Sequence, residues 1–115
     1  AGHMAPILRN GSQQVSEIGA DVSGMPLGIV SDQQFKQYQM QMKPEDSLVL
    51  FTDGISEGMN YANEIYGTER LASYVATGPQ NMKSLVSGIV EDVETFCDGR
   101  PQRDDMCLVA LQRTE

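Results

Sequence analysis

The sequence contains a single histidine, His3, and no tryptophan among its 115 residues. A serine–histidine–aspartate hydrolase needs a histidine beside its serine in the folded site, so one histidine at position 3 argues against that class. The only two cysteines, Cys97 and Cys107, do not have the spacing of zinc ligands, which argues against a structural zinc site. Both lie in apolar stretches. We expect them to be reduced core residues, as is typical of a cytoplasmic protein.

Basic residues are also scarce. The chain has 8 Lys and Arg residues against 16 Asp and Glu residues, which gives a net charge of −8. Nucleic-acid binding depends on Lys and Arg contacts to phosphate, so we expect no nucleic-acid partner. The same charge would repel a phosphorylated substrate unless a cation intervened. No stretch approaches the roughly 20 apolar residues of a membrane span. Signal-peptide, G-x-G-x-x-G and P-loop patterns are absent too, so neither secretion nor a nucleotide cradle is indicated.

What is present is enough for one small domain, because 40% of the 115 residues are hydrophobic. A chain of this size buries roughly two-thirds of its unfolded surface. Strand patterns and helix patterns occur together without a long βαβ alternation, which predicts an α+β fold of antiparallel strands covered by helices. We find no internal repeat and no domain boundary.

Two hairpins are predicted. Asn10-Gly11 lies between short apolar runs at residues 6–9 and 15–18, which is a strong hairpin signal. Apolar and polar residues partly alternate over residues 35–42, which predicts a half-buried strand. A turn at residues 43–46 would join that strand to residues 48–52 in a second hairpin.

Helices are expected in the second half of the chain. We expect irregular chain from Gly54 to Gly67, then a short helix over residues 69–75 that begins after an N-cap at Thr68. Asn81 is predicted to cap the longest helix. Its apolar stripe, at helical spacing, comprises Met82, Leu85, Val86, Ile89, Val90, Val93, Phe96 and Cys97. Its polar face comprises Lys83, Ser87, Glu91, Asp92 and Glu94.

Two acidic positions adjoin apolar runs that read as strands buried on both faces. Asp53-Gly54 follows the run at residues 48–51, and Asp104-Asp105 precedes the run at residues 106–111. Gly54 lets the chain turn sharply there. If the two strands are antiparallel neighbours, about 4.8 Å apart, Asp53 and Asp104 lie close enough to share a cation. The alternative is that both are simple turns, because Asp-Gly and Asp-Asp are common turn residues.

Further motifs surround these two positions in a recognisable order. They are Met25-Pro26-Leu27-Gly28-Ile29, residues 44–57 with Thr52-Asp53-Gly54 at their centre, Asn60, Tyr66-Gly67-Thr68-Glu69-Arg70-Leu71, and Asp104-Asp105-Met106-Cys107-Leu108-Val109. This order resembles the C-terminal half of the PPM-type metal-dependent serine/threonine phosphatases, in the bacterial branch of the stage II sporulation E and sigma-B regulator phosphatases. Residues 1–6 also resemble that branch's Ala-Gly-His-x-Pro-Pro entry to a strand, which favours a native start over the remnant of a tag.

The resemblance implies part of an α-β-β-α sandwich of antiparallel sheets flanked by helices, with Mn²⁺ or Mg²⁺ at one sheet end, two ions in the full domain. It implies that Asp53 and Asp104 are metal ligands and that a metal-activated water is the nucleophile, so no side chain is assigned a catalytic role. Asp105 takes the adjacent family position and is a further candidate near the metal. Gly54, Glu57 and Asn60 match family positions near the metal. For Glu57 and Asn60 we favour a role in ordering the loop or capping a helix over contact with substrate.

One expected motif is missing. The family's bridging aspartate comes from an Asp-x-x-Gly-His-Gly motif in an N-terminal half, which residues 1–115 do not contain. Asp21-Val22-Ser23-Gly24 mimics its start, but lacks His-Gly and reads as a turn. We therefore expect residues 1–115 to be the C-terminal part of a single phosphatase domain that is inactive alone. We also expect this part to be self-associated or strand-exchanged, because half a sandwich exposes a sheet face and sheet edges.

The function that the resemblance implies is hydrolysis of phosphoserine or phosphothreonine on a regulatory protein, such as an anti-sigma-factor antagonist. The alternative is a non-catalytic pseudophosphatase or protein-binding fragment. A cation-binding protein unrelated to phosphatases is a third possibility, but the chain has no loop with dense alternating Asp ligands.

Overall fold

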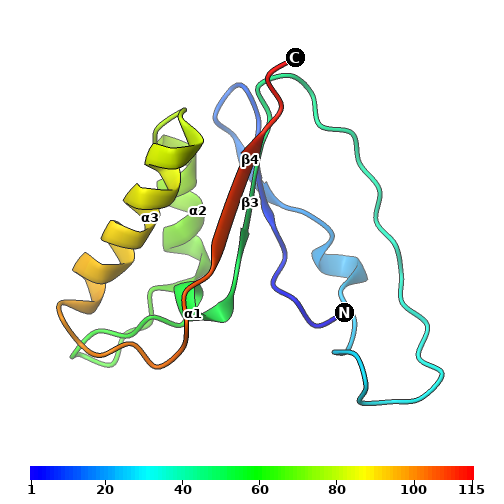
Figure 1. Cartoon of the computed structure of the whole chain (residues 1–115), viewed down its shortest axis with the longest axis horizontal. Coiled ribbons are helices and arrows are strands. Elements are labelled where there is room, and N and C mark those ends of the chain that lie inside the picture. Colours follow the sequence, from blue (N-terminus) through cyan, green and yellow to red (C-terminus); the bar gives the residue numbers. More distant parts are fainter.

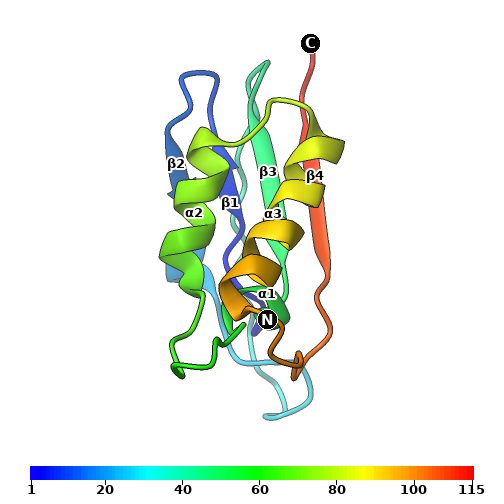
Figure 2. The same ribbon diagram turned by 90° about the vertical axis from the view of Figure 1, so that its left-hand side faces the viewer.

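The computed structural model describes all of residues 1–115 and shows one antiparallel sheet with helices packed on one of its faces (Figures 1 and 2). The four strands lie in the order β2-β1-β3-β4. Their bounds are β1 Ile7–Arg9, β2 Val15–Glu17, β3 Ser47–Phe51 and β4 Leu108–Gln112. The helices are α1 Asp53–Ser56, α2 Gly67–Thr77 and α3 Met82–Cys97, with a short 3-10 helix, η1, at Ala20–Val22. The predicted α+β fold class is therefore confirmed.

The first predicted hairpin is confirmed. Strands β1 and β2 pair antiparallel, with Arg9 opposite Val15. The Asn10 side chain closes the turn, because its Oδ1 accepts hydrogen bonds from the backbone N–H groups of Ser12 and Gln14, at 2.9 and 3.0 Å. An asparagine that bonds its own turn in this way is a local device, which explains why the sequence revealed it.

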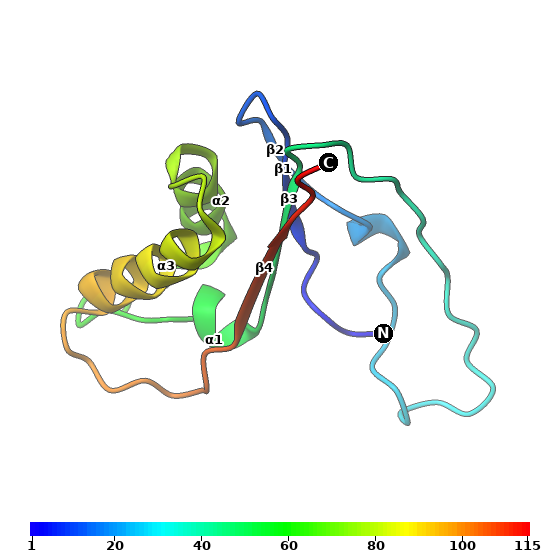
Figure 3. The ribbon, with the colours of Figure 1, turned by 45° about the horizontal axis from the view of Figure 1, so that its top comes forward.

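The second predicted hairpin is wrong. Strand β3 pairs with β1 on one side and β4 on the other, so neither edge is free for residues 35–42. Those residues form no strand, and Phe35 and Tyr38 are 45% and 51% exposed. In Figures 1 and 3 the segment between η1 and β3 runs out on the side of the sheet opposite α2 and α3. The alternation of polar and apolar residues favours a strand. A strand also needs the unpaired edge of a neighbouring strand for its backbone hydrogen bonds, and β3 has none.

Helix α3 matches its prediction closely. Asn81 is its N-cap, and its side chain accepts a hydrogen bond from the backbone N–H of Ser84 at 3.0 Å. Leu85, Ile89 and Val93 of the predicted stripe are buried. With 16 residues α3 is the longest helix, and no helix of this chain has the length and apolar character that a membrane crossing requires.

Helix α2 starts differently from the prediction. It begins at Gly67, its N-cap is Tyr66 and no side chain caps it, so the predicted Thr68 cap is wrong. Its start is held by packing instead, since Tyr66 is buried and donates a hydrogen bond to Asp92 Oδ2 at 2.5 Å. Burial, followed by this bond, raises the pKa of the Tyr66 hydroxyl. Asp92, predicted on the polar face of the longest helix, is half-buried and accepts this bond.

A buried arginine fastens α2 to the sheet. The Arg9 side chain on β1 is 1% exposed. Its Nη1 donates to the carbonyl oxygens of Val75 and Gly78 at 2.8 and 3.3 Å, and its Nη2 donates to that of Pro79 at 3.2 Å. Carbonyls at a helix C-terminus carry partial negative charge and lack partners within the helix. Burial lowers the pKa of the guanidinium, and these three acceptors offset that cost.

Helices cover only one face of the sheet (Figure 1). Ser47, Val49 and Phe51 of β3 are buried under the helices. On the opposite face, Val109 and Leu111 of β4 are 52% and 43% exposed. The predicted strands are apolar on both faces, but their burial on both faces is not seen. The prediction that both cysteines are core residues is also wrong in part, since Cys107 is exposed while Cys97 is half-buried and neither is in a disulfide.

The ends of β3 and β4 are joined beyond the regular ladder. The backbone N–H of Thr52 donates to the carbonyl of Cys107 at 3.1 Å, and the Thr52 hydroxyl accepts from the Cys107 N–H at 3.0 Å. The next residues form α1, so the predicted irregular chain directly after Gly54 is wrong. Gly54 lies inside this helix without a positive φ. A Cβ atom there would overlap the carbonyl oxygen of Asp105 and come within 2.8 Å of its carbonyl carbon. Close approach of two backbones, and not a sharp turn, is what requires glycine.

We therefore expect Gly54→Ala to lower the free energy of unfolding by about 2–3 kcal/mol, because the added methyl forces the 104–105 segment away from α1. Gly24→Ala is the matched control, since the nearest atom to an added Cβ is 3.9 Å away, and it should change stability by less than about 0.5 kcal/mol. Urea denaturation followed by circular dichroism measures both. Equal stability of the two variants would contradict the close-approach explanation.

Candidate metal centre

Three carboxylates gather where β3 and β4 end. Asp53, Glu57 and Asp104 each offer an oxygen, and these oxygens all lie within 4.8 Å of one another. All three residues are exposed. We call this group the carboxylate cluster. Its members come from both ends of α1 and from the segment that leads into β4.

The strand register explains why residues so distant in sequence meet. Strands β3 and β4 pair antiparallel, with Phe51 opposite Leu108. The exit of β3 therefore lies beside the entrance of β4, and the Gly54 contact brings the two backbones together there. The predicted antiparallel pairing is confirmed, and the structure brings Asp53 and Asp104 together as that pairing requires.

Glu57 joins the cluster through α1. It directly follows the helix, as its C-cap, four residues after Asp53. Side chains four residues apart lie on the same face of a helix, so both carboxylates point to the same place. Glu57 was a predicted candidate, with a role in ordering the loop or capping a helix favoured, and it does lie at the C-cap of α1. The Asp53–Glu57 spacing was the signal for the cluster, and the expectation of irregular chain after Gly54 concealed it.

The other candidate residues lie outside the cluster. Asn60 orders the following loop, since its Oδ1 accepts hydrogen bonds from the N–H groups of Ala62 and Glu64 at 3.0 and 2.9 Å. The carbonyl of Asp105 accepts from the Thr52 hydroxyl at 3.3 Å, but the Asp105 carboxylate is not part of the group. Asp21, the residue of the mimic motif, lies in η1 and is not part of it either.

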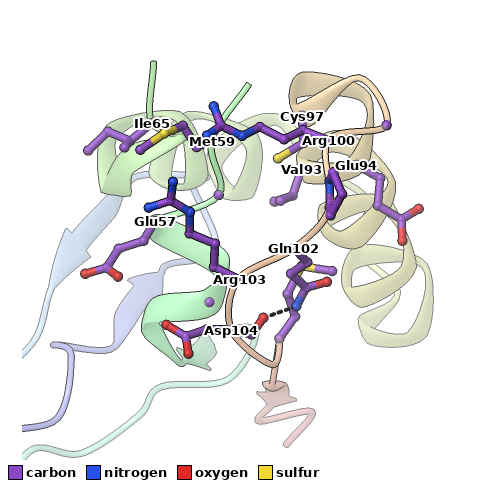
Figure 4. Close-up of a pocket in the computed structure, with 15 residues that line it drawn as sticks. Glu57, Met59, Ile65, Val93, Glu94, Cys97, Arg100, Gln102, Arg103 and Asp104 are labelled. Carbon is purple, nitrogen blue, oxygen red and sulfur yellow. Dashed lines mark hydrogen bonds between the residues drawn. The ribbon is translucent and has the colours of Figure 1, made fainter. Parts of the chain in front are cut away.

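A cavity of about 680 Å³ opens beside the cluster, and we call it the flanking cavity (Figure 4). Gly54, Glu57 and Asp104 are among its lining residues. The Gln102 side chain donates a hydrogen bond to the carbonyl of Asp104, which holds the segment before β4 in place. A candidate reactive centre thus adjoins a concave space, which is the usual setting of a ligand site.

The donor set fits a hard divalent cation. Carboxylate oxygens suit Mg²⁺ and Mn²⁺, whereas zinc sites in proteins favour cysteine and histidine. Neither His3 nor the two cysteines belongs to the cluster. Like charges this close repel one another unless a cation lies between them. The residues present therefore fit the divalent metal that the sequence predicts.

The known proteins that are similar to this chain include bacterial phosphatase domains. The curated protein IcfG of Synechocystis is 22% identical over 91 residues, which cover 79% of this chain and 14% of IcfG. The phosphatase domain of SpoIIE from Bacillus subtilis, presoaked in Mn, superposes with a TM-score of 0.74 at 22% identity, covering 99% of this chain and 48% of that one. A structure of RsbU and RsbW domains from Mycobacterium tuberculosis gives 0.76 at 25% identity, covering 99% and 32%.

The chain thus spans less than half the length of these relatives. The family model described as stage II sporulation protein E (SpoIIE) matches residues 1–114. The fold, the family match and the acidic cluster agree, and the chain belongs to the SpoIIE family, in the branch of PPM-type phosphatases that includes SpoIIE and RsbU.

Proposed function

We propose that residues 1–115 form the C-terminal part of a metal-dependent phosphoserine/phosphothreonine protein phosphatase domain. The observation that carries the proposal is the carboxylate cluster, whose oxygens lie within 4.8 Å of one another at the end of two paired strands. The family match over residues 1–114 supports the same reaction class. An acidic protein of net charge −8 needs cations at its site if it is to accept an anionic phosphate.

In this proposal Asp53 and Asp104 hold Mn²⁺ or Mg²⁺, and Glu57 is a third carboxylate ligand. When bound, two such ions supply an activated water and neutralise the charge of the phosphate. The chain's own residues hold the acidic segments in position. Gly54 lets the two acidic segments touch, and the Thr52 hydroxyl ties the segment before β4 to the end of β3.

The proposal includes a second part of the domain. The solved relatives extend well beyond the matched region, which covers 48% of the SpoIIE chain. By the resemblance already described, the bridging aspartate of an Asp-x-x-Gly-His-Gly motif would come from that other part. Asp53, Glu57 and Asp104 alone then make an incomplete metal site, and we propose that residues 1–115 are inactive without the rest of the domain.

The substrate we propose is a phosphorylated regulatory protein, such as an anti-sigma-factor antagonist. The resemblance to sigma-B regulator phosphatases supports it, as does the matched structure that pairs RsbU with RsbW domains. We also propose a cytoplasmic location. The two free cysteines, Cys97 and Cys107, support a reducing compartment.

The first test is Mn²⁺-dependent hydrolysis of p-nitrophenyl phosphate by the full-length gene product. We expect activity that Asp53→Asn and Asp104→Asn each reduce by more than about 100-fold, since loss of a ligand should cost at least as much as loss of its supporting residues. The 115-residue chain should be inactive. Asp21→Asn is the matched control and should retain activity, because Asp21 lies outside the cluster.

A full-length protein that is inactive with Mn²⁺, both on p-nitrophenyl phosphate and on phosphoprotein substrates, would contradict the enzyme. The same result would favour the alternative, a non-catalytic pseudophosphatase or protein-binding fragment.

Glu57 has its own test, which does not depend on turnover. We expect Glu57→Gln to weaken Mn²⁺ binding to the full-length protein by about 10-fold, since a neutral amide replaces one of three clustered carboxylates. Isothermal titration calorimetry measures the affinity. Glu69→Gln is the control, because Glu69 is exposed on α2 and outside the cluster. An unchanged affinity in Glu57→Gln would return Glu57 to the loop-ordering role.

The open sheet face leads to a further expectation. We propose that the rest of the domain covers it, and that the isolated 115-residue chain self-associates through Val109 and Leu111, which are 52% and 43% exposed. Size-exclusion chromatography with light scattering should show a dimer or larger species. Val109→Lys should shift it toward monomer, whereas Tyr61→Ser, at an exposed residue elsewhere, should not. A stable monomer of the unsubstituted chain would rule this out.

A further inference from the structure

The flanking cavity is continuous with the carboxylate cluster but has a different chemical character. Its cluster end is lined by Gly54, Glu57 and Asp104. Its other walls are the loop after α1, the C-terminal end of α3 and the segment that leads into β4. A group bound at the carboxylates would therefore have the rest of its molecule directed along this space.

The apolar side chains that line the flanking cavity are aliphatic or contain sulfur. Val93 and Cys97 come from α3, Met59 and Ile65 from the loop after α1, and Met106 from the approach to β4. In Figure 4 the α3 side chains face Met59 across the space, while the carboxylate of Glu94 points outward. Ile65 is 52% exposed, so part of its side chain is open to a ligand. Methionine side chains adapt readily to the shape of a bound apolar group.

Hydrogen bonds fix the walls of the flanking cavity relative to one another. Arg100 Nη1 donates to the carbonyl of Asn60 at 2.6 Å and to Asn63 Oδ1 at 2.9 Å, which links the loop after α3 to the loop after α1. A β-bridge between Met59 and Ile65 closes the base of the second loop. The cavity is therefore pre-formed, and a ligand would not have to spend binding energy on opening it.

The lining of the flanking cavity also includes two guanidinium groups, beside the carboxylates of Glu57, Glu94 and Asp104. Arg100 and Arg103 both line it, although the chain has only 8 basic residues in all. Arg100 is occupied by the bonds to the Asn60 loop. Arg103 makes no hydrogen bond of its own, and in Figure 4 its side chain reaches toward the side of the cavity where Glu57 lies. A free guanidinium suits an anionic phosphate nearby, because such charge-assisted bonds are the strong ones.

From these features we infer that the flanking cavity is a subsite for the substrate polypeptide: an apolar side chain close to the phosphorylated residue packs on Met59 and Ile65, while Arg103 faces the phosphate. The inference rests on the proposed phosphatase function and adds a preference among phosphoproteins. A volume of about 680 Å³ is large enough for a short stretch of peptide. The apolar lining selects the flanking residue, and the guanidinium contributes equally whatever that residue is.

The test compares two phosphoserine peptides, one flanked on both sides by leucine and one by glycine, as substrates of the full-length protein with Mn²⁺. The leucine peptide should have a kcat/KM about 10-fold higher, which is the usual scale for filling an apolar pocket. Ile65→Ser should lower the ratio of the two kcat/KM values about 5-fold or more. Ile65 is over half exposed, so this change leaves the buried core intact. Tyr61→Ser, in the same loop but outside the lining, should leave the ratio unchanged.

Arg103→Gln separates charge from apolar packing. It should lower kcat/KM for both peptides in parallel and keep their ratio. Equal kcat/KM values for the two peptides in the unsubstituted protein, or an unaltered ratio in Ile65→Ser, would overturn the subsite while leaving the phosphatase intact. Failure to hydrolyse p-nitrophenyl phosphate and both peptides would overturn the proposed function itself, and the subsite with it.

Discussion

The contact between Gly54 and the backbone of Asp105 is the constraint on which the rest of the site depends. A side chain at position 54 would collide with the Asp105 carbonyl. Glycine lets the start of α1 lie directly against the segment before β4. The Thr52 hydroxyl and backbone hold the same two segments through bonds to Cys107. The separation of Asp53 and Asp104 is thus set by backbone packing at the ends of two paired strands, which is more rigid than a pair of free loops.

The helices secure this arrangement from one side of the sheet. Arg9 satisfies three carbonyls at the end of α2, and the stripe of α3 buries Leu85, Ile89 and Val93. The C-terminal end of α3 then directs the chain around the flanking cavity, where Arg100 fixes the loop after α1. Stability and site geometry are therefore served by the same elements.

The exposed apolar face of the sheet and the match to only part of each relative have one explanation in our proposal. Val109 and Leu111 are apolar and exposed on the face opposite the helices. The chain matches 48% of the SpoIIE phosphatase structure. Strands that are apolar on both faces are typical of sheets covered on both sides, and exposed apolar patches favour association. The second layer and the remaining metal ligand are, in our proposal, contributions of the same missing part.

The sequence by itself determined the features that depend on neighbours along the chain. The Asn10 turn, the Asn81 cap, the stripe of α3 and the apolar runs beside Asp53 and Asp104 are all local patterns, and each appears in the fold. Tertiary structure alone decided the rest. Residues 35–42 alternate like a strand, yet β1 and β4 occupy both edges of β3. Glu57 joins the cluster only because α1 forms where irregular chain was expected, and Gly54 is needed for a contact with a residue about 50 positions away in sequence. Local propensities specify elements, whereas edge pairing and close backbone approach depend on partners that the chain supplies from a distance.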